Sequence, residues 1–272
     1  MAPVIVCVGL TTIDIAQVVT QLPAANSKIT ATDAWLDVGG PAANAARVAS
    51  HDGCQVRLVT ALGDSALAAL ARERLAGIEI IDVAPPGHRL PVSTVFITPD
   101  GSRAVVSRNA TALDSIRQPD PAVLDGAEVV LHDGHLLDVS FALATNPSPI
   151  HVLDGGSWKP GLEKLLPLID VAVISADFAL PRSTPERALD DLAGLGIPRL
   201  ARTCGGDAVQ AMIGEQLGLF PVPRVEVVDS TGAGDVLHGS LVAQLAGGID
   251  FTKALRNAIV EASESVTHYR IL

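Results

Sequence analysis

Short runs of β-branched and aliphatic residues alternate with helical segments along most of this chain. The first run, Val4–Gly9, is followed by polar residues and is typical of a strand buried on both faces. Further strands are expected at 55–61, 128–131, 150–153, 171–175, 199–203 and 208–213. Helices are expected at 41–50, 65–76, 139–144, 185–193, 234–245 and 251–267. Strands and helices in alternation predict an α/β fold with a mostly parallel central sheet covered by helices.

The composition favours an aliphatic core in one domain. Of the 272 residues, 48% are hydrophobic but only 3% are aromatic, so Val, Leu, Ile and Ala must fill the interior, as in parallel sheets. No internal repeat, low-complexity tract or linker interrupts the chain. We therefore expect a single α/β domain over 1–272, and neither a disulfide-stapled scaffold nor an aromatic-rich β module.

Two segments with looser alternation stand apart from this pattern. The first covers about 13–38, with Pro23 and Asn26 marking a turn. The second covers 93–107, where the turn Pro99–Ser102 separates two short strands. We expect these two hairpins to come together as a small β-sheet lid. Because open strand edges associate readily, a homodimer through this lid is a further hypothesis.

Charge and cysteine content limit the partners and the compartment. Lys and Arg number 19 against 30 Asp and Glu, for a net charge of -11, which excludes a nucleic-acid partner but not a small anion such as a nucleotide. The three cysteines, Cys7, Cys54 and Cys204, form no C-x-x-C pair and fit a reduced, cytoplasmic protein. The opening apolar stretch Val4–Leu10 follows no cationic region, so we expect neither a signal peptide nor a membrane partner.

The segment 227–239 is the most informative one for chemistry. Gly232, Ala233 and Gly234 form a tight turn of small residues directly before a helical run. Their N–H groups would be free donors at a helix N-terminus, where the dipole favours an anion. Asp235 follows in the first turn, where a carboxylate could accept a hydroxyl proton during phosphoryl transfer. A plain helix cap is the alternative, and the segment is neither a Walker A loop nor a dinucleotide fingerprint.

Two motifs in order resemble one family. Asp229–Asp235 resembles the D-T-x-G-A-G-D signature of the ribokinase (PfkB) family of carbohydrate kinases, and Gly39–Ala46 is similar to its G-G-x-x-x-N-x-A motif. The resemblance extends from Val4 to about Thr267. It implies a ribokinase-like three-layer sandwich with a β-sheet lid, and an enzyme that transfers a phosphoryl group from ATP, with Mg²⁺, to a primary hydroxyl of a sugar. Similarity to the ketohexokinase and sulfofructose kinase branches favours a ketohexose or fructose derivative.

The resemblance also assigns roles to single residues. It makes Asp235 the catalytic base, Gly232–Gly234 the anion hole, and Asp229 a possible site for a monovalent cation such as K⁺. Without the family, the sugar contact Asp14 would be an ordinary strand-end residue, and Asn44 a cap or surface helix residue. The residues predicted to bind the sugar substrate are Asp14, Gly39, Gly40 and Asn44, with Arg108, Asn109 and His135 as further candidates.

A second glycine-rich turn is the candidate nucleotide contact. Arg202–Ala208 resembles the family's T-x-G-x-x-G turn, although Ala208 replaces the last glycine. An ordinary turn between strands is the alternative. The residues predicted to bind the nucleotide are Thr203, Gly205, Gly206 and Thr231.

One family feature is absent. Many members carry N-x-x-E near the end of a central strand, where the glutamate helps to organise magnesium, but residues 175–178 read Ser-Ala-Asp-Phe. Phe178 therefore stands in place of that glutamate. Asp177 could act on the ion through water, and the nucleotide phosphates and water should provide most of its ligands, because Mg²⁺ keeps much of its hydration shell.

Histidines and a lysine near the predicted sheet edge are further candidates for the site. His132–His135 could indicate a metal site, but its spacing and the lack of a third ligand favour lining of the substrate pocket. His238, one turn after Asp235, is interpreted as a packed helix residue outside the site. Lys159 could face donor phosphates, although a solvated loop lysine is the preferred interpretation.

Two other functions remain open at this stage. A nucleoside or vitamin kinase of the same superfamily would need an aromatic side chain to stack on the acceptor, and few aromatics lie near the predicted pocket. A catalytically weak sugar-binding or regulatory protein would fit the missing glutamate. The intact Asp235 and the Gly-Ala-Gly turn argue against that second alternative.

Overall fold

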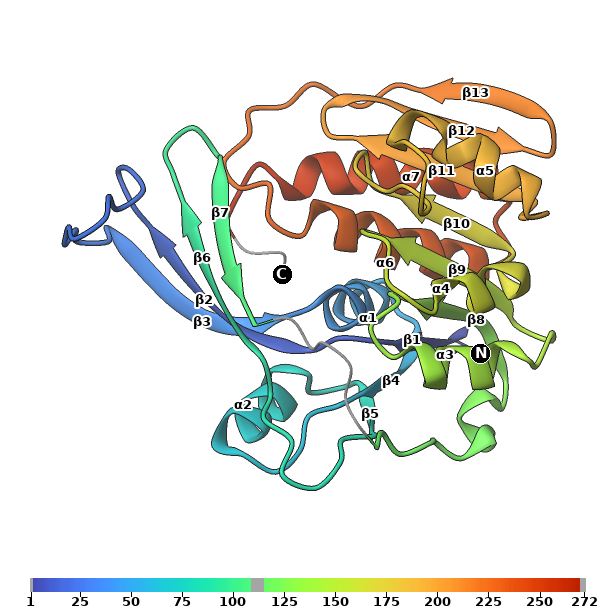
Figure 1. Cartoon of the computed structure of the whole chain (residues 1–272), viewed down its shortest axis with the longest axis horizontal. Helices are drawn as coiled ribbons and strands as arrows, with labels where there is room; N and C mark the ends of the chain where they lie inside the picture. Colours follow the sequence, from blue (N-terminus) through green and yellow to red (C-terminus); the bar gives the residue numbers. More distant parts are fainter. Residues whose placement is uncertain (1, 109–114, 270–272) are drawn as a thin grey trace.

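Two sheets of unequal size form this molecule. The computed structural model describes residues 2–108 and 115–269. Within these residues, nine strands form a large sheet in the order β13-β12-β11-β10-β9-β8-β1-β4-β5, and four form a small sheet in the order β3-β2-β6-β7. The small sheet extends from one side of the large one (Figure 1). The predicted α/β architecture with a separate small sheet is confirmed.

The large sheet is parallel except at one edge. Its parallel strands are β1 (Val4–Val8), β4 (Gln55–Thr60), β5 (Glu79–Asp82), β8 (Ala127–His132), β9 (Ile150–Gly155), β10 (Val171–Ile174) and β11 (Arg199–Cys204). The antiparallel strands β12 (Asp207–Ile213) and β13 (Gln216–Phe220) complete that edge. Sequence analysis missed β5 and β13, because edge strands are only partly covered and do not need a continuous apolar run.

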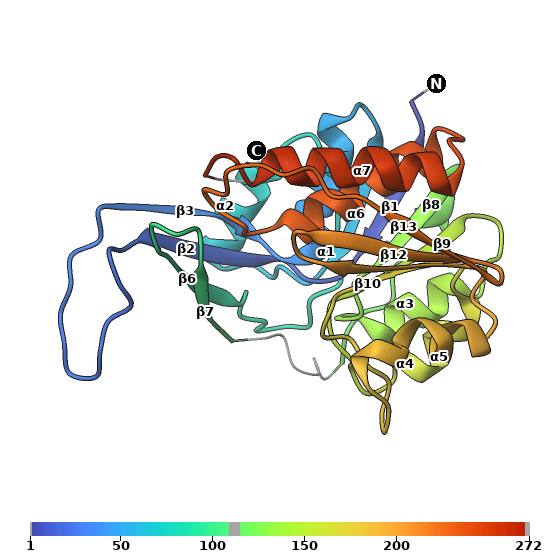
Figure 2. The same cartoon turned by 90° about the horizontal axis from the view of Figure 1, so that it is seen from above.

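Helices cover both faces of the large sheet (Figure 2). One face carries α1 (Pro41–His51), α2 (Ala66–Arg74), α6 (Ala233–Ala246) and α7 (Phe251–Ser265). The other carries α3 (Leu137–Ala144), α4 (Leu162–Leu165) and α5 (Ala188–Gly194), and short 3-10 turns lie at 121–124, 166–168 and 185–187. In the part of the chain that the structure describes, no helix is long and apolar enough to cross a membrane.

Strand β1 shows why the central strands read as continuous apolar runs. Ile5 and Cys7 are fully buried in the core beneath α1 and α6. Val6 and Val8 are equally buried in the core on the opposite face, beneath α3. Because successive side chains of a strand point to opposite faces, a sheet covered on both sides favours apolar residues at successive positions.

The small sheet consists of the two expected hairpins. β2 (Thr12–Val18) pairs with β3 (Asp33–Gly39), and β6 (Val92–Ile97) pairs with β7 (Arg103–Ser107). The hairpins, far apart in sequence, are joined by parallel pairing of β2 with β6. The prediction that they form one sheet is therefore confirmed.

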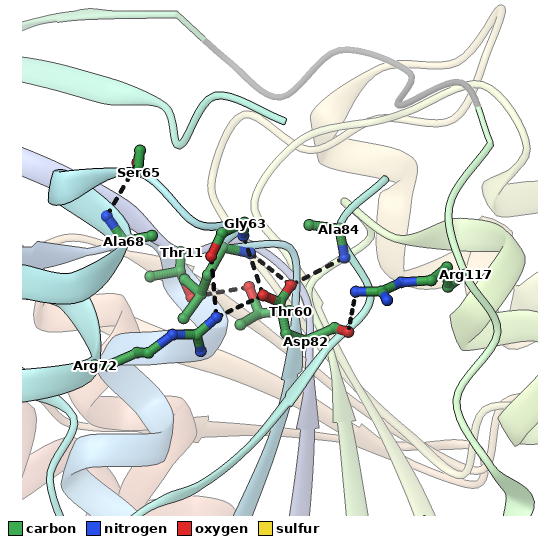
Figure 3. A network of polar contacts seen from close by, with 10 residues as sticks. Thr11, Thr60, Gly63, Ser65, Ala68, Arg72, Asp82, Ala84 and Arg117 are labelled. Carbon is green, nitrogen blue, oxygen red and sulfur yellow. Dashed lines mark hydrogen bonds and ion pairs between the residues drawn. The ribbon is translucent and has the colours of Figure 1, made fainter. Parts of the chain in front are cut away.

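A polar network fixes the chain where the small sheet leaves the large one (Figure 3). Thr11 and Thr60 share a hydrogen bond of 2.9 Å between their hydroxyls, which connects the start of β2 to the end of β4. Partial burial raises the pKa of Asp82, but its hydrogen bonds outweigh burial and the pKa is lowered overall. The donors to Asp82 are the backbone N–H groups of Leu62, Gly63 and Ala84 and the guanidinium of Arg72.

A buried pair of histidines lies between β8 and β9. Nε2 of His132 is 3.1 Å from Nδ1 of His151, and Nε2 of His151 lies 2.8 Å from the carbonyl oxygen of Asn146. Burial, reinforced by the neighbouring His151, lowers the pKa of His132 from 6.5 to about 3. His132 is thus neutral in the folded protein over a pH range in which the unfolded chain binds a proton.

This difference predicts acid sensitivity of the fold. As pH falls below 6.5, the unfolded state takes up a proton that the folded state does not. His132 should therefore lower the free energy of unfolding by up to about 1.4 kcal/mol per pH unit. His132→Gln, which can still donate to His151, should lose this one-proton dependence. Urea unfolding of both proteins at several pH values measures it, and identical pH slopes would contradict the assignment.

Candidate active site

The loop that enters α6 forms a sharp turn with exposed backbone donors. Gly232 caps the helix with φ 76°, in the left-handed region that favours glycine. The loop is held from behind, because the N–H groups of Val228 and Asp229 both donate to the Val266 carbonyl after α7. The Ala233 N–H makes only a long contact of 3.5 Å, with Ser230 O. The first turn of α6 therefore offers donors to an anion, as predicted.

Successive residues of this loop border two different pockets. Asp229 and Thr231 line a small pocket beneath the small sheet, which we call the lid pocket. Ser230, Ala233 and Gly234 line a second pocket of 480 Å³ against α7, which we call the helix pocket. The N-terminus of α6 thus lies where the two pockets meet.

The lid pocket combines polar and apolar side chains and is built from β2, β3, β6, α1 and the loop. Arg47 of α1 forms an ion pair of 3.3 Å with Asp37 of β3. Asp14 accepts a hydrogen bond of 2.7 Å from Thr12, and burial raises the pKa of Asp14. The lining side chains are Asp14, Ala16, Trp35, Asp37, Val38, Asn44, Arg47, Val95, Ile97, Asp229 and Thr231.

Two buried polar atoms bordering the lid pocket lack a protein partner. They are Oδ1 of Asn44 and Oγ1 of Thr231, both without a hydrogen bond among the described residues. Buried polar atoms are normally satisfied, so each marks a place for a polar group of a ligand. Hydroxyl groups of a sugar can serve both, since a hydroxyl donates and accepts.

Asp235 lies in the first turn of α6, directly after Ala233 and Gly234 of the helix pocket. Its carboxylate accepts a hydrogen bond of 2.7 Å from Nδ2 of Asn44. Burial, helped by the charge of Asp154, raises the pKa of Asp235 to about 7, against the opposing effects of Asn44, His238 and Arg103. A carboxylate that ionises near neutral pH is suited to take a proton from a hydroxyl.

Arg103 of β7 connects the small sheet to the same loop. Its guanidinium donates to the carbonyl oxygen of Ser230 at 2.6 Å. At the neighbouring turn, a Cβ atom on Gly101 would lie 3.0 Å from Val227. The second hairpin therefore packs on the side of the large sheet where Asp235 lies, as expected for a lid.

The glycines before α1 allow close approach of the backbone. A Cβ atom on Gly39 would lie 1.9 Å from a carboxylate oxygen of Asp14. Gly40 has φ 99°, and a Cβ atom there would lie 2.4 Å from the Leu10 carbonyl oxygen. Both glycines therefore position Asp14 and the start of α1 without themselves presenting a side chain.

The predicted nucleotide contacts separate into two groups. Thr203, Gly205 and Gly206 line the helix pocket together, on the turn after β11. Thr231 lies on the other side and lines the lid pocket. Its prediction as a nucleotide contact therefore does not match its position, because alternate residues of the loop face different pockets.

Three other predicted site residues lie away from both pockets. His135 is paired with Asp133 at 3.2 Å and borders a separate small cavity. Arg108 is exposed at the end of β7 and lines neither pocket, and Asn109 lies outside the described residues. Asp177 is exposed, whereas Phe178 beside it is fully buried in the core on the α4 and α5 face, against Trp158.

Metal ligation by side chains has little support in this geometry. Within residues 2–108 and 115–269, no group of three or more His, Cys, Asp or Glu side chains is placed to hold a metal ion. Asp229 is buried and accepts the N–H of Thr231 at 2.8 Å.

Sequence reasoning missed several residues that line the lid pocket. Trp35 and Asp37 lie directly opposite Ala16 and Asp14 in the β2–β3 pairing and share their face. Arg47 follows Asn44 by three residues, and residues three apart share a face of a helix. Starting from Asp14 and Asn44, the strand pairing and the helix spacing would have identified Trp35, Asp37 and Arg47 as neighbours in the same pocket.

The fold and the loop define the class of this protein, a ribokinase-like α/β protein. The crystal structure of a putative ribokinase from Agrobacterium tumefaciens has a TM-score of 0.86 at 22% identity, covering 99% of this chain and 93% of that one. The structure of Arabidopsis thaliana ribokinase complexed with ribose and ATP has a TM-score of 0.80 at 22% identity, covering 99% and 94%.

Sequence comparisons identify the family. The ribokinase of Bacillus subtilis (strain 168) is 25% identical over 290 residues, covering 97% of this chain and 93% of that protein. The model of the pfkB family carbohydrate kinases matches residues 3–270, and the chain belongs to this family. The predicted family and its carbohydrate kinase activity are thus confirmed, whereas the ketohexokinase and sulfofructose kinase branches find no support.

The raised pKa of Asp235 predicts the pH dependence of the activity. Below pH about 7 the carboxyl is protonated and cannot accept a proton, so kcat/KM for the sugar should fall about tenfold per pH unit and level off above. Asn44→Ala removes a hydrogen-bond donor that lowers the pKa of Asp235. In this variant the fall of kcat/KM should therefore begin at higher pH. Steady-state rates across this range measure both effects, and a profile that stays flat well into the acid range would contradict them.

Proposed function

We propose that this protein is an ATP-dependent sugar kinase that transfers the γ-phosphoryl group directly to a primary hydroxyl held in the lid pocket. The observation that carries this proposal is the position of Asp235, which follows Gly234 of the helix pocket and is hydrogen-bonded to Asn44 of the lid pocket. A hydroxyl entering from the lid pocket and a phosphate entering from the helix pocket would meet there in line.

Each part of the junction has a chemical task in this mechanism. Asn44, Thr231 and Asp14 hydrogen-bond the sugar, and Asp235 accepts the proton of the attacking hydroxyl. The N–H groups of Gly232–Gly234 and the dipole of α6 stabilise the charge on the phosphoryl group during transfer. No phosphoenzyme is needed. The small sheet excludes water that would otherwise hydrolyse ATP.

The helix pocket suits the nucleotide. Its apolar wall can take the adenine ring, and its volume of 480 Å³ is in the usual range for ligand pockets. Thr203, Gly205 and Gly206 lie at its edge. Magnesium, when bound with ATP, would neutralise phosphate charge, and Asp229 is our candidate contact for K⁺.

Ribose is the acceptor that we place first, with fructose as the alternative. The relatives reported above are ribokinases, which supports a pentose. Arg47 is already paired with Asp37, so the described lining of the lid pocket has no unpaired cation for a sulfonated sugar. Free cysteines throughout the chain fit the cytoplasm, where we propose that the enzyme works.

A nucleoside is the second candidate acceptor because Trp35 lines the lid pocket. An indole ring there could stack on a base. ATP consumption with ribose, fructose and adenosine separates the candidates. A Trp35→Leu variant that loses activity on adenosine, but not on ribose, would favour the nucleoside.

The outer face of the small sheet is our candidate for contact with a second copy of the chain. Leu36 and Val106 are 46% and 69% exposed there, in one row across the sheet with Ile15 and Thr94. Light scattering of the wild type and of Leu36→Lys tests this proposal, since a dimer formed through this face should dissociate in the variant.

Asp235→Asn should lower turnover about 100-fold to 10,000-fold, because the amide keeps the shape but cannot accept a proton. The KM for the sugar should change little. Asp177→Ala is the matched control, because this carboxylate is exposed and lies outside the first turn of α6, and it should affect magnesium activation only modestly. An Asp235→Asn enzyme with near-normal turnover would overturn the assignment of Asp235 as the base. An inactive Asp177→Ala enzyme would overturn the proposal that nucleotide phosphates and water provide most of the magnesium ligands.

A further inference from the structure

His238 contacts three elements at the base of the candidate anion site. It lies on α6 one turn after Gly234, and its side chain is 7% exposed. Nδ1 is 2.7 Å from the Gly234 carbonyl oxygen, and Nε2 is 3.2 Å from the Val173 carbonyl oxygen of β10. Nε2 also lies 3.6 Å from Oδ1 of Asp154 at the end of β9. Its packing was expected from the sequence, but its contact with the site was not.

These contacts decide the charge of the ring. A carbonyl oxygen can only accept a hydrogen bond, so Nδ1 must carry a proton to bond Gly234, and Nε2 must carry one to bond Val173. A ring with both nitrogens protonated is an imidazolium cation. Asp154 is the carboxylate placed to balance it, and a buried ion pair with satisfied hydrogen bonds can persist where a lone charge cannot.

We propose that His238 is a positively charged positioning residue, paired with Asp154, that holds the first turn of α6 in place for phosphoryl transfer. This inference rests on the proposed function. The hydrogen bond to Gly234 fixes the carbonyl of the residue that precedes Asp235, and the hydrogen bond to Val173 and the ion pair with Asp154 hold that turn on the sheet. Small displacements of a reacting group lower the rate strongly, so the effect should be on turnover.

Other charged groups surround this pair without replacing it. Burial raises the pKa of Asp154 overall and the charge of Asp133 adds to this, whereas His238, Lys159 and His135 oppose the rise. Lys159 lies near the carbonyl oxygens of Asp133 and Ser157, at 3.4 Å from each. Among the described groups that act on Asp154, His238 is the one that also bonds the first turn of α6.

Kinetics of three variants separate positioning from general damage. His238→Leu should lower kcat by roughly 100-fold with little change in KM for sugar or ATP. His238→Asn keeps a donor near the position of Nδ1 and should recover much of this loss. The matched control is Ser240→Ala, which alters another buried side chain of α6 whose hydroxyl accepts from Gln244, and it should keep wild-type kcat.

Nitrogen NMR of the histidine rings tests the charge without any turnover. Both ring nitrogens of His238 should carry a proton at neutral pH, and Asp154→Asn should remove one of them. A neutral His238 ring in the wild type overturns the proposal. Because the NMR measurement uses the wild type, it tests the charge even if His238→Leu does not fold. Wild-type kcat in folded His238→Leu also overturns it. If Asp235→Asn stays active instead, the proposed function fails, whereas the charge of His238 is judged by NMR alone.

Discussion

One buried carboxylate, that of Asp133 at the end of β8, connects the segments from which the site is built. It accepts hydrogen bonds from the backbone N–H groups of Leu10 after β1, Ala42 at the start of α1, and His135. Burial raises its pKa, but His135 and these hydrogen bonds lower it overall, so the group stays ionised and keeps its bonds. Gly9 has to be a glycine here, because a Cβ atom would lie 2.0 Å from this carboxylate. The path of the chain into β2, and thus into the small sheet, begins at this point.

The contacts of Asp133 position the candidate active site through α1 and α6. Once Ala42 is fixed, α1 presents Asn44 to Asp235 and Arg47 to Asp37. Glycine at position 239 allows α6 to lie close to α1, since a Cβ atom there would be 2.6 Å from Val48. The two helices therefore pack in close contact. The carboxyl group that we propose as the base accepts a hydrogen bond from the Asn44 amide of the neighbouring helix. The anion site itself depends on backbone N–H groups, which substitution of side chains leaves intact.

The sequence predicted the features that local pattern and motif determine, and missed those set by packing. Apolar runs and helix signals located the central strands, the helices except the short α4, and both hairpins, because a sheet buried on both faces leaves a clear apolar run. Strands β5 and β13 lie at edges and carry no such run. Of the residues that the glycine-rich segments singled out, Asn44 and Gly205 line the pockets, and Asp235 is hydrogen-bonded to Asn44. His135 was assigned because it follows a strand at the carboxyl edge of the sheet, and Thr231 and Asp177 because of their places in family motifs, but the direction of each side chain depends on tertiary contacts such as the pair of His135 with Asp133.

The central claim is that one carboxylate joins two separate pockets, one for the sugar and one for ATP. It is tested most directly by the crystal structure of a ternary complex with ribose and a non-hydrolysable ATP analogue. The account predicts a sugar hydroxyl oxygen within hydrogen-bond distance of Asp235 and the terminal phosphate against the N–H groups of Gly232–Gly234, reached from the helix pocket. A sugar bound away from Asp235, or a terminal phosphate that approaches from anywhere but the helix pocket, would contradict it.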